Sequence, residues 1–275
     1  MKSKIILSLT ILFIFITSTI AQPRKLDDIL ITSYKWQMDT LLIYNNVTYQ
    51  FLDKKESVEE NILNYTVNLR YNLLNRIQIM GFASIDTRSK KRFLEDDNKV
   101  KKHTETEFNG AGIGITYHLL HEGTHPGLIF SALTNIVDKQ PYVSKNDYFK
   151  TFSFYLTSYY SVDPVVFFIQ GLYQLNLDRD MDGKTLQVGD VFAITPQVYF
   201  LANPYVSFNF GIKWLLKEED KYDDDILFTS SSSLGWLFGF SYEIAENTLI
   251  SLDTEFRNQA NFVRSSAIFR LVFRF

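Results

Sequence analysis

The sequence predicts an all-β fold, a transmembrane antiparallel up-and-down β-barrel of about twelve strands with short periplasmic turns and longer extracellular loops. Three observations predict this class. Long segments alternate between apolar and polar residues, as strands with two different faces do. The apolar positions are unusually aromatic, with Phe 24 and Tyr 16 in 275 residues. The chain also begins with an apolar segment typical of exported proteins.

Composition excludes several function classes. The chain contains no cysteine, which rules out disulfides, iron–sulfur clusters and thiol catalysis. The formal net charge of −3 gives no reason to expect nucleic-acid binding. No motif requires a cofactor, so we expect none.

The N-terminus predicts export and sets the domain boundaries. Lys2 and Lys4 precede an apolar run, and Thr19 and Ala21 stand where signal peptidase tolerates small residues. We therefore interpret residues 1–21 as a signal peptide, 22–40 as an N-terminal periplasmic or plug segment, and 41–275 as the barrel.

The stretch NILNYTVNLRYNLL shows the strand pattern most clearly. Leu63, Tyr65 and Leu69 fall on one face, and polar residues such as Asn64 and Arg70 fall on the other. Runs of this kind hold roughly ten residues or more, the length that a tilted strand needs to cross a bilayer. A closed barrel is the all-β structure that leaves no backbone group unpaired in lipid.

The same pattern predicts twelve strands, an even number that places both termini in the periplasm. Short and long connectors alternate along the chain, and Pro196 predicts a bulge or a local break. The predicted strands are 41–52, 61–74, 76–86, 106–119, 127–137, 149–161, 165–177, 190–201, 205–217, 226–243, 248–257 and 263–275.

The last strand, IFRLVFRF, ends in Phe275. An aromatic residue at the terminus of an alternating last strand resembles the signal read by the barrel assembly machinery. We therefore expect Phe275 to be an assembly signal.

The segment HEGTH, His121 to His125, matches the zinc-peptidase pattern H-E-x-x-H. That site requires a helix, whereas Gly123 and Pro126 and the flanking alternation predict a turn between two strands. No histidine follows His125 to supply a third ligand, so we predict a hairpin turn and no metal.

Two other patterns carry weak signals. Asp178, Asp180, Asp182 and Gly183 match the first half of a calcium loop, but Gly189 stands where the closing glutamate belongs. An ordinary solvated loop is the favoured interpretation, with loose cation binding as the alternative. A membrane-embedded hydrolase is disfavoured because the chain has no G-x-S-x-G motif, so we expect no catalytic residues and no enzyme.

Polar positions opposite the apolar faces predict the lining of the lumen. Asp253 and Glu255 precede a strand that carries Arg270 and Arg274, so opposite charges would pair between neighbouring strands. These pairs either satisfy one another inside a narrow barrel or select a solute. The candidate lumen residues are Arg70, Lys213, Asp253, Glu255, Arg270 and Arg274.

Four stretches resemble an outer-membrane transporter family linked to phenol meta-cleavage pathways. They are LNYTVNLRYNLLNRIQIMGF, FNGAGIGITYHLL, SYYSVDPVVFFIQGLYQLNLDRD and VGDVFAITPQVYFLANPYVSFNFG. The resemblance implies a twelve-stranded barrel and passage of small, including aromatic, compounds.

We expect a protein of the cell outer membrane that acts as a passive channel for small solutes. A structural or surface-interaction barrel with a closed lumen is the alternative. Expected partners are outer-membrane lipid, lipopolysaccharide, the barrel assembly machinery and an unidentified small-molecule solute.

Overall fold

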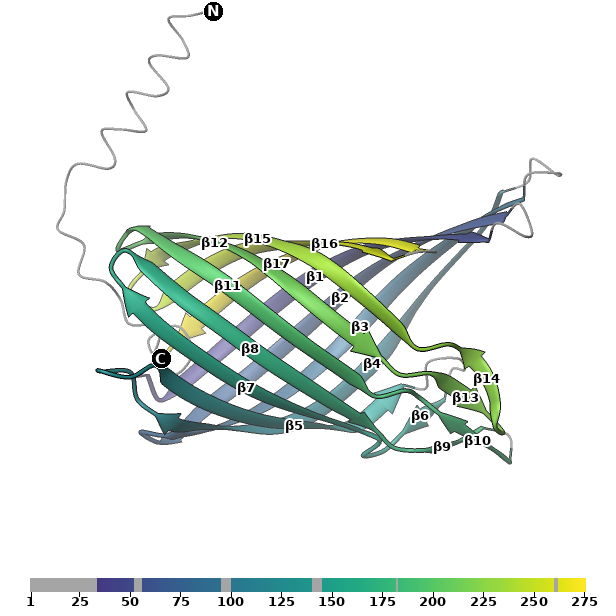
Figure 1. The fold of residues 1–275 in the computed structure, drawn as a ribbon, viewed down its shortest axis with the longest axis horizontal. Helices are drawn as coiled ribbons and strands as arrows, with labels where there is room; N and C mark the ends of the chain where they lie inside the picture. The colour runs from purple at the N-terminus through teal and green to yellow at the C-terminus, as the bar shows by residue number, and fades with distance from the viewer. Residues whose placement is uncertain (1–33, 52–55, 95–99, 140–144, 182, 260–261) are drawn as a thin grey trace, which may run out of the picture.

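Twelve long antiparallel strands close into a barrel, as the sequence predicts (Figure 1). The computed structural model describes residues 34–275, except 52–55, 95–99, 140–144, 182 and 260–261. Each barrel strand pairs with its neighbours in chain order, and the ring closes where β1 (Trp36–Phe51) pairs with β17 (Phe262–Arg274). The other ten are β2 (Glu56–Leu74), β3 (Ile77–Leu94), β4 (Val100–Leu120), β5 (Gly127–Lys139), β7 (Thr151–Val162), β8 (Val165–Asn176), β11 (Val191–Asn203), β12 (Val206–Lys217), β15 (Ser231–Ala245) and β16 (Thr248–Gln259).

The two faces of the wall have the polarity that alternation predicts. Large apolar side chains such as Tyr65 and Trp236 point outward, and each is 46% exposed. Polar side chains such as Asp39 and Gln78 point inward and are almost completely buried. Exposed apolar and buried polar residues reverse the arrangement of a water-soluble fold, so the outer surface is suited to hydrocarbon.

No helix in the described part of the chain is long and apolar enough to cross a membrane.

The connectors differ in length between the two ends of the barrel (Figure 1). Two residues link β2 to β3, β7 to β8, β11 to β12 and β15 to β16, and six link β4 to β5. β1 begins and β17 ends at this same end, which we call the short-turn end. The longer hairpins project from the opposite, long-loop end.

The strand boundaries correct the sequence analysis at four places, one of which is β2, which begins at Glu56 and not at 61. β1 begins at Trp36, so residues 36–40, expected before the barrel, belong to its wall; residues 1–33 lie outside the described part. β3 and β4 continue beyond the predicted limits of 86 and 106, because their backbone ladder persists into a charged segment expected to be a loop. The predicted strand 226–243 divides into two elements, of which β15 is the second.

The first of those elements joins a small sheet that the sequence analysis missed. β14 (Asp225–Phe228), β13 (Asp220–Tyr222), β10 (Lys184–Gln187) and β9 (Arg179–Met181) form four strands at the long-loop end (Figure 1). Asp223 and Asp224 close the β13–β14 turn with positive φ angles of 52° and 70°. Consecutive positive φ angles are typical of tight hairpins, so the acidic run forms a turn and not an open loop. We call these four strands the loop sheet.

Pro196 interrupts one ladder without shifting its register. β11 pairs continuously with β8 through Pro196, but its pairing with β12 lacks Thr195 and Pro196 and then resumes in the same register at Gln197. Proline has no amide hydrogen to donate, which explains the gap. Of the two predicted outcomes, the local break is therefore the one observed.

Glycines make room for side chains inside the barrel. A Cβ atom at Gly112 on β4 would collide with the Thr134 carbonyl oxygen and with the Phe82 ring, which lies over the glycine. At Gly123, in the β4–β5 turn, a Cβ atom would meet open space.

We therefore expect Gly112→Ala to destabilise the folded barrel by about 1–3 kcal/mol, because the backbone of β5 must move to admit the methyl group. Denaturant titration of the protein in detergent micelles measures this change. Gly123→Ala is the matched control and should leave the midpoint unchanged. Equal midpoints for both variants would contradict the tight packing at Gly112.

Candidate functional site in the barrel interior

All six lumen residues predicted from the sequence lie on inward-facing positions of β2, β12, β16 and β17. They do not form one cluster. The structure divides them into an Arg70 group, a Lys213–Glu255 group, Asp253, Arg270 and Arg274, and it adds partners that the sequence analysis did not name.

Arg70 is paired with a buried aspartate on β1. Its Nη2 atom lies 2.9 Å from Asp39 Oδ2, and Gln37 Nε2 donates to Asp39 Oδ1 at 2.7 Å. Asp39 is only 1% exposed, so its charge depends on these two neighbours. The pair links β1 to β2 inside the wall.

Glu255 joins cations from two strands. Lys213 Nζ on β12 lies 3.5 Å from Glu255 Oε2, and Arg257 on β16 donates to Glu255 Oε1 from Nε at 3.0 Å. β12 and β16 are not adjacent, because β15 runs between them. Gly235 on β15 stands between Lys213 and Arg257 in the ladder and offers no side chain, which leaves the space for Glu255 to reach Lys213.

Gly239 has the same role four residues farther along β15. A Cβ atom there would overlap the Oδ1 atoms of both Asn209 and Asp253. These side chains therefore meet across β15, above the glycine. Ser251 Oγ also donates to Asp253 at 3.4 Å.

β17 contributes three arginines to the lumen, which are Arg264, Arg270 and Arg274. Arg264 donates to Asn45 Oδ1 at 2.8 Å, and Ser266 Oγ donates to the same atom at 2.7 Å. Arg274 is buried at the short-turn end and has an interaction partner. Arg270 lies between them. The expected pairing of Asp253 and Glu255 with Arg270 and Arg274 is not observed as ion pairs, because Glu255 turns to Lys213 and Arg257.

An apolar cluster lines another part of the interior. Ile129, Tyr159, Val166 and Phe168 are buried on β5, β7 and β8, near the short-turn end. Phe168 packs edge-on against Tyr199 of β11 at a centroid distance of 5.8 Å. The lumen therefore has an apolar sector on these strands and a charged sector on β12, β16, β17, β1 and β2.

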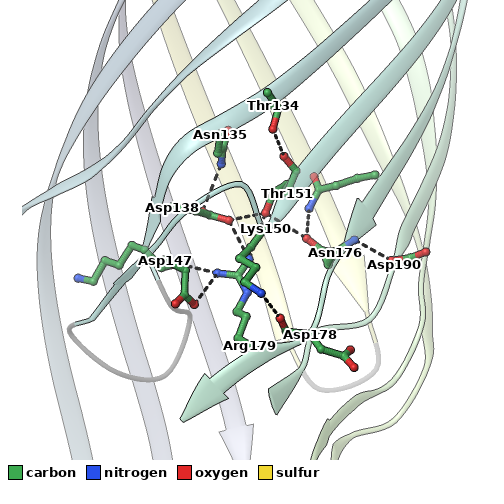
Figure 2. Close-up of polar contacts among 12 residues, drawn as sticks. Thr134, Asn135, Asp138, Asp147, Lys150, Thr151, Asn176, Asp178, Arg179 and Asp190 are labelled. Carbon is green, nitrogen blue, oxygen red and sulfur yellow. Dashed lines mark hydrogen bonds and ion pairs between the residues drawn. The ribbon is translucent and has the colours of Figure 1, made fainter. Parts of the chain in front are cut away.

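Arg179 attaches the loop sheet to the rim of the barrel, as Figure 2 shows. Its Nη2 atom lies 2.8 Å from Asp138 Oδ2 and donates to Thr151 Oγ1 at 3.1 Å, and its Nη1 atom lies 3.9 Å from Asp147 Oδ2. The Arg179 side chain is 3% exposed. Since Asp138, Asp147 and Thr151 come from β5, β6 (Asn146–Asp147) and β7, one side chain holds β9 against three strands.

A second buried group supports the same sheet. Asp220 on β13 accepts from the Gly189 amide at 2.8 Å and pairs with Lys217 Nζ at 2.7 Å. At the exposed edge, Asp223 lies 2.9 Å from Lys184, and its hydrogen bond and charge raise the pKa of that amine.

The H-E-x-x-H segment forms the β4–β5 turn, as predicted, and has no helical residue. Glu122 accepts hydrogen bonds from the backbone amide and the Oγ atom of Ser161, which ties this turn to the end of β7. His118 points inward, with its Nδ1 atom 3.5 Å from that of His121. Within the described residues no group of three or more acidic or histidine side chains could hold a metal ion.

The calcium-like segment forms the β9–β10 hairpin and not a solvated loop. Gly183 has a φ angle of +80° in its turn, a conformation that favours glycine. Asp182 lies outside the described residues. The residue of this motif with a structural role is Arg179, which alternates with the aspartates.

The sequence analysis missed five polar partners. Arg257 and Arg264 could have been found from the sequence, because both stand at polar positions of alternating strands. Asp39 was missed because β1 was expected to begin later. Neither Asn209 nor Arg179 carried a distinguishing pattern, since their roles depend on Gly239 and on the loop sheet.

Comparisons with known proteins show the fold. No family model matches the sequence, and no curated protein matches it. An outer-membrane channel from Pseudomonas putida F1 is similar in structure, with a TM-score of 0.66 and 8% identity over 87% of this chain and 95% of that one. The translocator domain of autotransporter NalP from Neisseria meningitidis gives a TM-score of 0.57, with 8% identity over 90% and 91% of the chains. The NanC porin gives 0.51, with 10% identity over 85% and 100%.

Replacing Arg179 with Gln should release the loop sheet, because Asp138 and Asp147 lose a buried cationic partner. We expect tryptic cleavage after Lys184 to be faster by at least about tenfold in the folded protein. Mass spectrometry of the cleaved fragments measures the rate.

The matched control is Lys145→Ala, which removes exposed contacts with Asp180 of the same hairpin, an ion pair at 3.8 Å and a hydrogen bond to the backbone oxygen at 3.3 Å. Its cleavage rate should stay within about twofold of the wild type. If the Arg179 variant also stays in that range, Arg179 does not hold the sheet.

Proposed function

We propose that the chain is an outer-membrane channel for small solutes. The observation that carries the proposal is a closed wall with an apolar outer face around an interior lined by charged side chains. Such an interior is costly unless it is hydrated or occupied, because charges need water or partners. The structural neighbours include an outer-membrane channel and a porin, which supports the same class of function.

In this proposal the apolar face contacts outer-membrane lipid and lipopolysaccharide, with short turns in the periplasm and the loop sheet outside the cell. Solutes would be small, because side chains of the apolar cluster, such as Tyr159 at 1% exposure, leave little space near the short-turn end. Small aromatic compounds fit the resemblance to the meta-cleavage transporters and the apolar sector beside Tyr199 and Phe168.

A barrel with a closed lumen is the second candidate. The near-complete burial of Asp39, Tyr159 and His118 at the short-turn end favours it. Such a barrel would act through its outer surface and its projecting hairpins.

Conductance in planar bilayers separates the two candidates. A channel should show discrete conductance steps, and Lys213→Met should change their size by about twofold or more, because the lumen field concentrates ions. Lys221→Met is the matched control, since Lys221 lies on the loop sheet and pairs with Glu219 there. A purified, folded protein with no steps would favour the closed barrel.

We also propose that Phe275 is the signal for outer-membrane assembly. Its backbone pairs with Trp36 at 2.8 and 2.9 Å, which closes the barrel at its end, while its side chain is 60% exposed. The ring is therefore accessible and not needed for packing.

Phe275→Ala should lower the amount of folded protein in the outer-membrane fraction by several-fold (about threefold or more), without a matching loss of stability once the barrel is folded. Phe256→Ala is the control, because Phe256 also points outward and is 52% exposed. Equal amounts for the two variants would refute the assignment.

A further inference from the structure

Arg270, in the charged sector of the lumen, has no hydrogen-bond or ion-pair partner among the residues that the structure describes. Arg70 pairs with Asp39, Lys213 and Arg257 with Glu255, and Arg264 with Asn45. Arg270 makes no hydrogen bond or ion pair with any described residue, and its Nε atom is buried without an acceptor. A buried nitrogen donor without an acceptor costs free energy, so the Nε atom of Arg270 is available for a further acceptor.

Small hydroxyl residues surround Arg270 on one side. It lies opposite Ser251 of β16, which lies opposite Ser241 of β15 and then Ser207 of β12. These inward-facing side chains are too short to fill the space before the guanidinium. They leave room for a small ligand beside Arg270, although Ser251 already donates to Asp253 and Ser207 and Ser241 bond to each other.

A second guanidinium faces the same region. In the two ladders of β1, Arg270 is opposite Leu41 and Arg70 is opposite Gln37, four residues away along the same inner face, and the two like charges interact. The Nη2 atom of Arg70 is engaged by Asp39, but its Nε atom is also buried without an acceptor. Two guanidinium groups with unused donors therefore lie on the two strands that flank β1.

The carboxylate near Arg270 does not complete the site. Asp253 is in electrostatic range of Arg270 but makes no ion pair with it. Its oxygen atoms are directed to Ser251 and across Gly239 to Asn209. Asp39 and Asp253 nevertheless reduce the net charge of the region, so a monoanion matches it better than a dianion does.

We propose that Arg270 and Arg70 form a binding site for a small carboxylate in the lumen. The proposal rests on the proposed channel function and names the class of solute. The planar fork of an arginine matches the two oxygens of a carboxylate, which a spherical chloride ion cannot use in the same way. Tyr199 lies in one ladder row with Asn209, Gly239 and Asp253, so its aromatic side chain belongs to the part of the lumen next to this site.

Acetate binding tests the site without requiring conduction. The methyl proton resonance of acetate should broaden saturably with the folded protein in non-ionic detergent micelles. At constant ionic strength, chloride and inorganic phosphate should displace acetate weakly. Arg270→Gln should weaken acetate binding by about tenfold or more, because it removes a charge-assisted pair of hydrogen bonds.

Two further variants make the test specific. Arg88→Gln is the matched control, since Arg88 is a lumen arginine already paired with Asp86 at 3.3 Å, and acetate binding should persist. Arg270→Lys keeps the charge but loses the fork, so binding should be intermediate. Heat-dependent migration on gels shows that each variant is folded, and Arg270→Lys decides the outcome if Arg270→Gln does not fold.

Bilayer recordings separate this proposal from the channel proposal. If broadening of the acetate resonance is lost in Arg270→Gln and kept in Arg88→Gln, the site is supported even if the wild type does not conduct. A wild type that conducts without broadening acetate, or an Arg270 variant that binds acetate as the wild type does, would overturn it. Displacement by phosphate as strong as by acetate itself would also overturn the carboxylate assignment.

Discussion

The closure of the hydrogen-bonded ring is the constraint on which the rest of this structure depends. β1 pairs with β17 along most of their lengths, and Trp36 and Phe275 add the final backbone bonds. Without that seam, the edge strands would present unpaired amide and carbonyl groups to hydrocarbon, where no water can satisfy them. Because the seam joins the two ends of the described chain, the barrel is complete only when all twelve strands are in register.

Closure also fixes what the interior can be. Inward side chains from all strands share one narrow space, so each large side chain requires a small one nearby. Gly112 accommodates Phe82, and Gly127 accommodates Tyr159. Gly235 and Gly239 leave gaps on β15, through which polar groups of β12 and β16 meet. The polar network of the lumen therefore depends on the positions of the glycines as well as on the positions of the charged residues.

The loop sheet at the rim of the barrel also depends on contacts between segments that are far apart in the sequence. Arg179 and Asp220 are buried charges in segments that read as solvated loops, and each is paired with a group from a distant part of the chain. The sequence analysis missed these roles because a DRDMDG or KEEDKYDDD stretch looks the same whether it is solvated or folded over a rim. The decisive contacts, Asp138 with Arg179 and Gly189 with Asp220, join residues 41 and 31 positions apart.

The sequence by itself determined the fold class, the number of barrel strands, the two faces of the strands it predicted and the turn at HEGTH, because a strand's alternation is local and its period is fixed. It also placed Arg70, Lys213 and Arg270 on the inner face. Only the tertiary structure decided which charges pair. Partners such as Lys213 and Glu255 meet across a strand that separates them, and the distance between them depends on the curvature of the wall and on the absence of a side chain at Gly235. No local pattern encodes that geometry, which is why Arg270 could be recognised as unpaired only in the closed barrel.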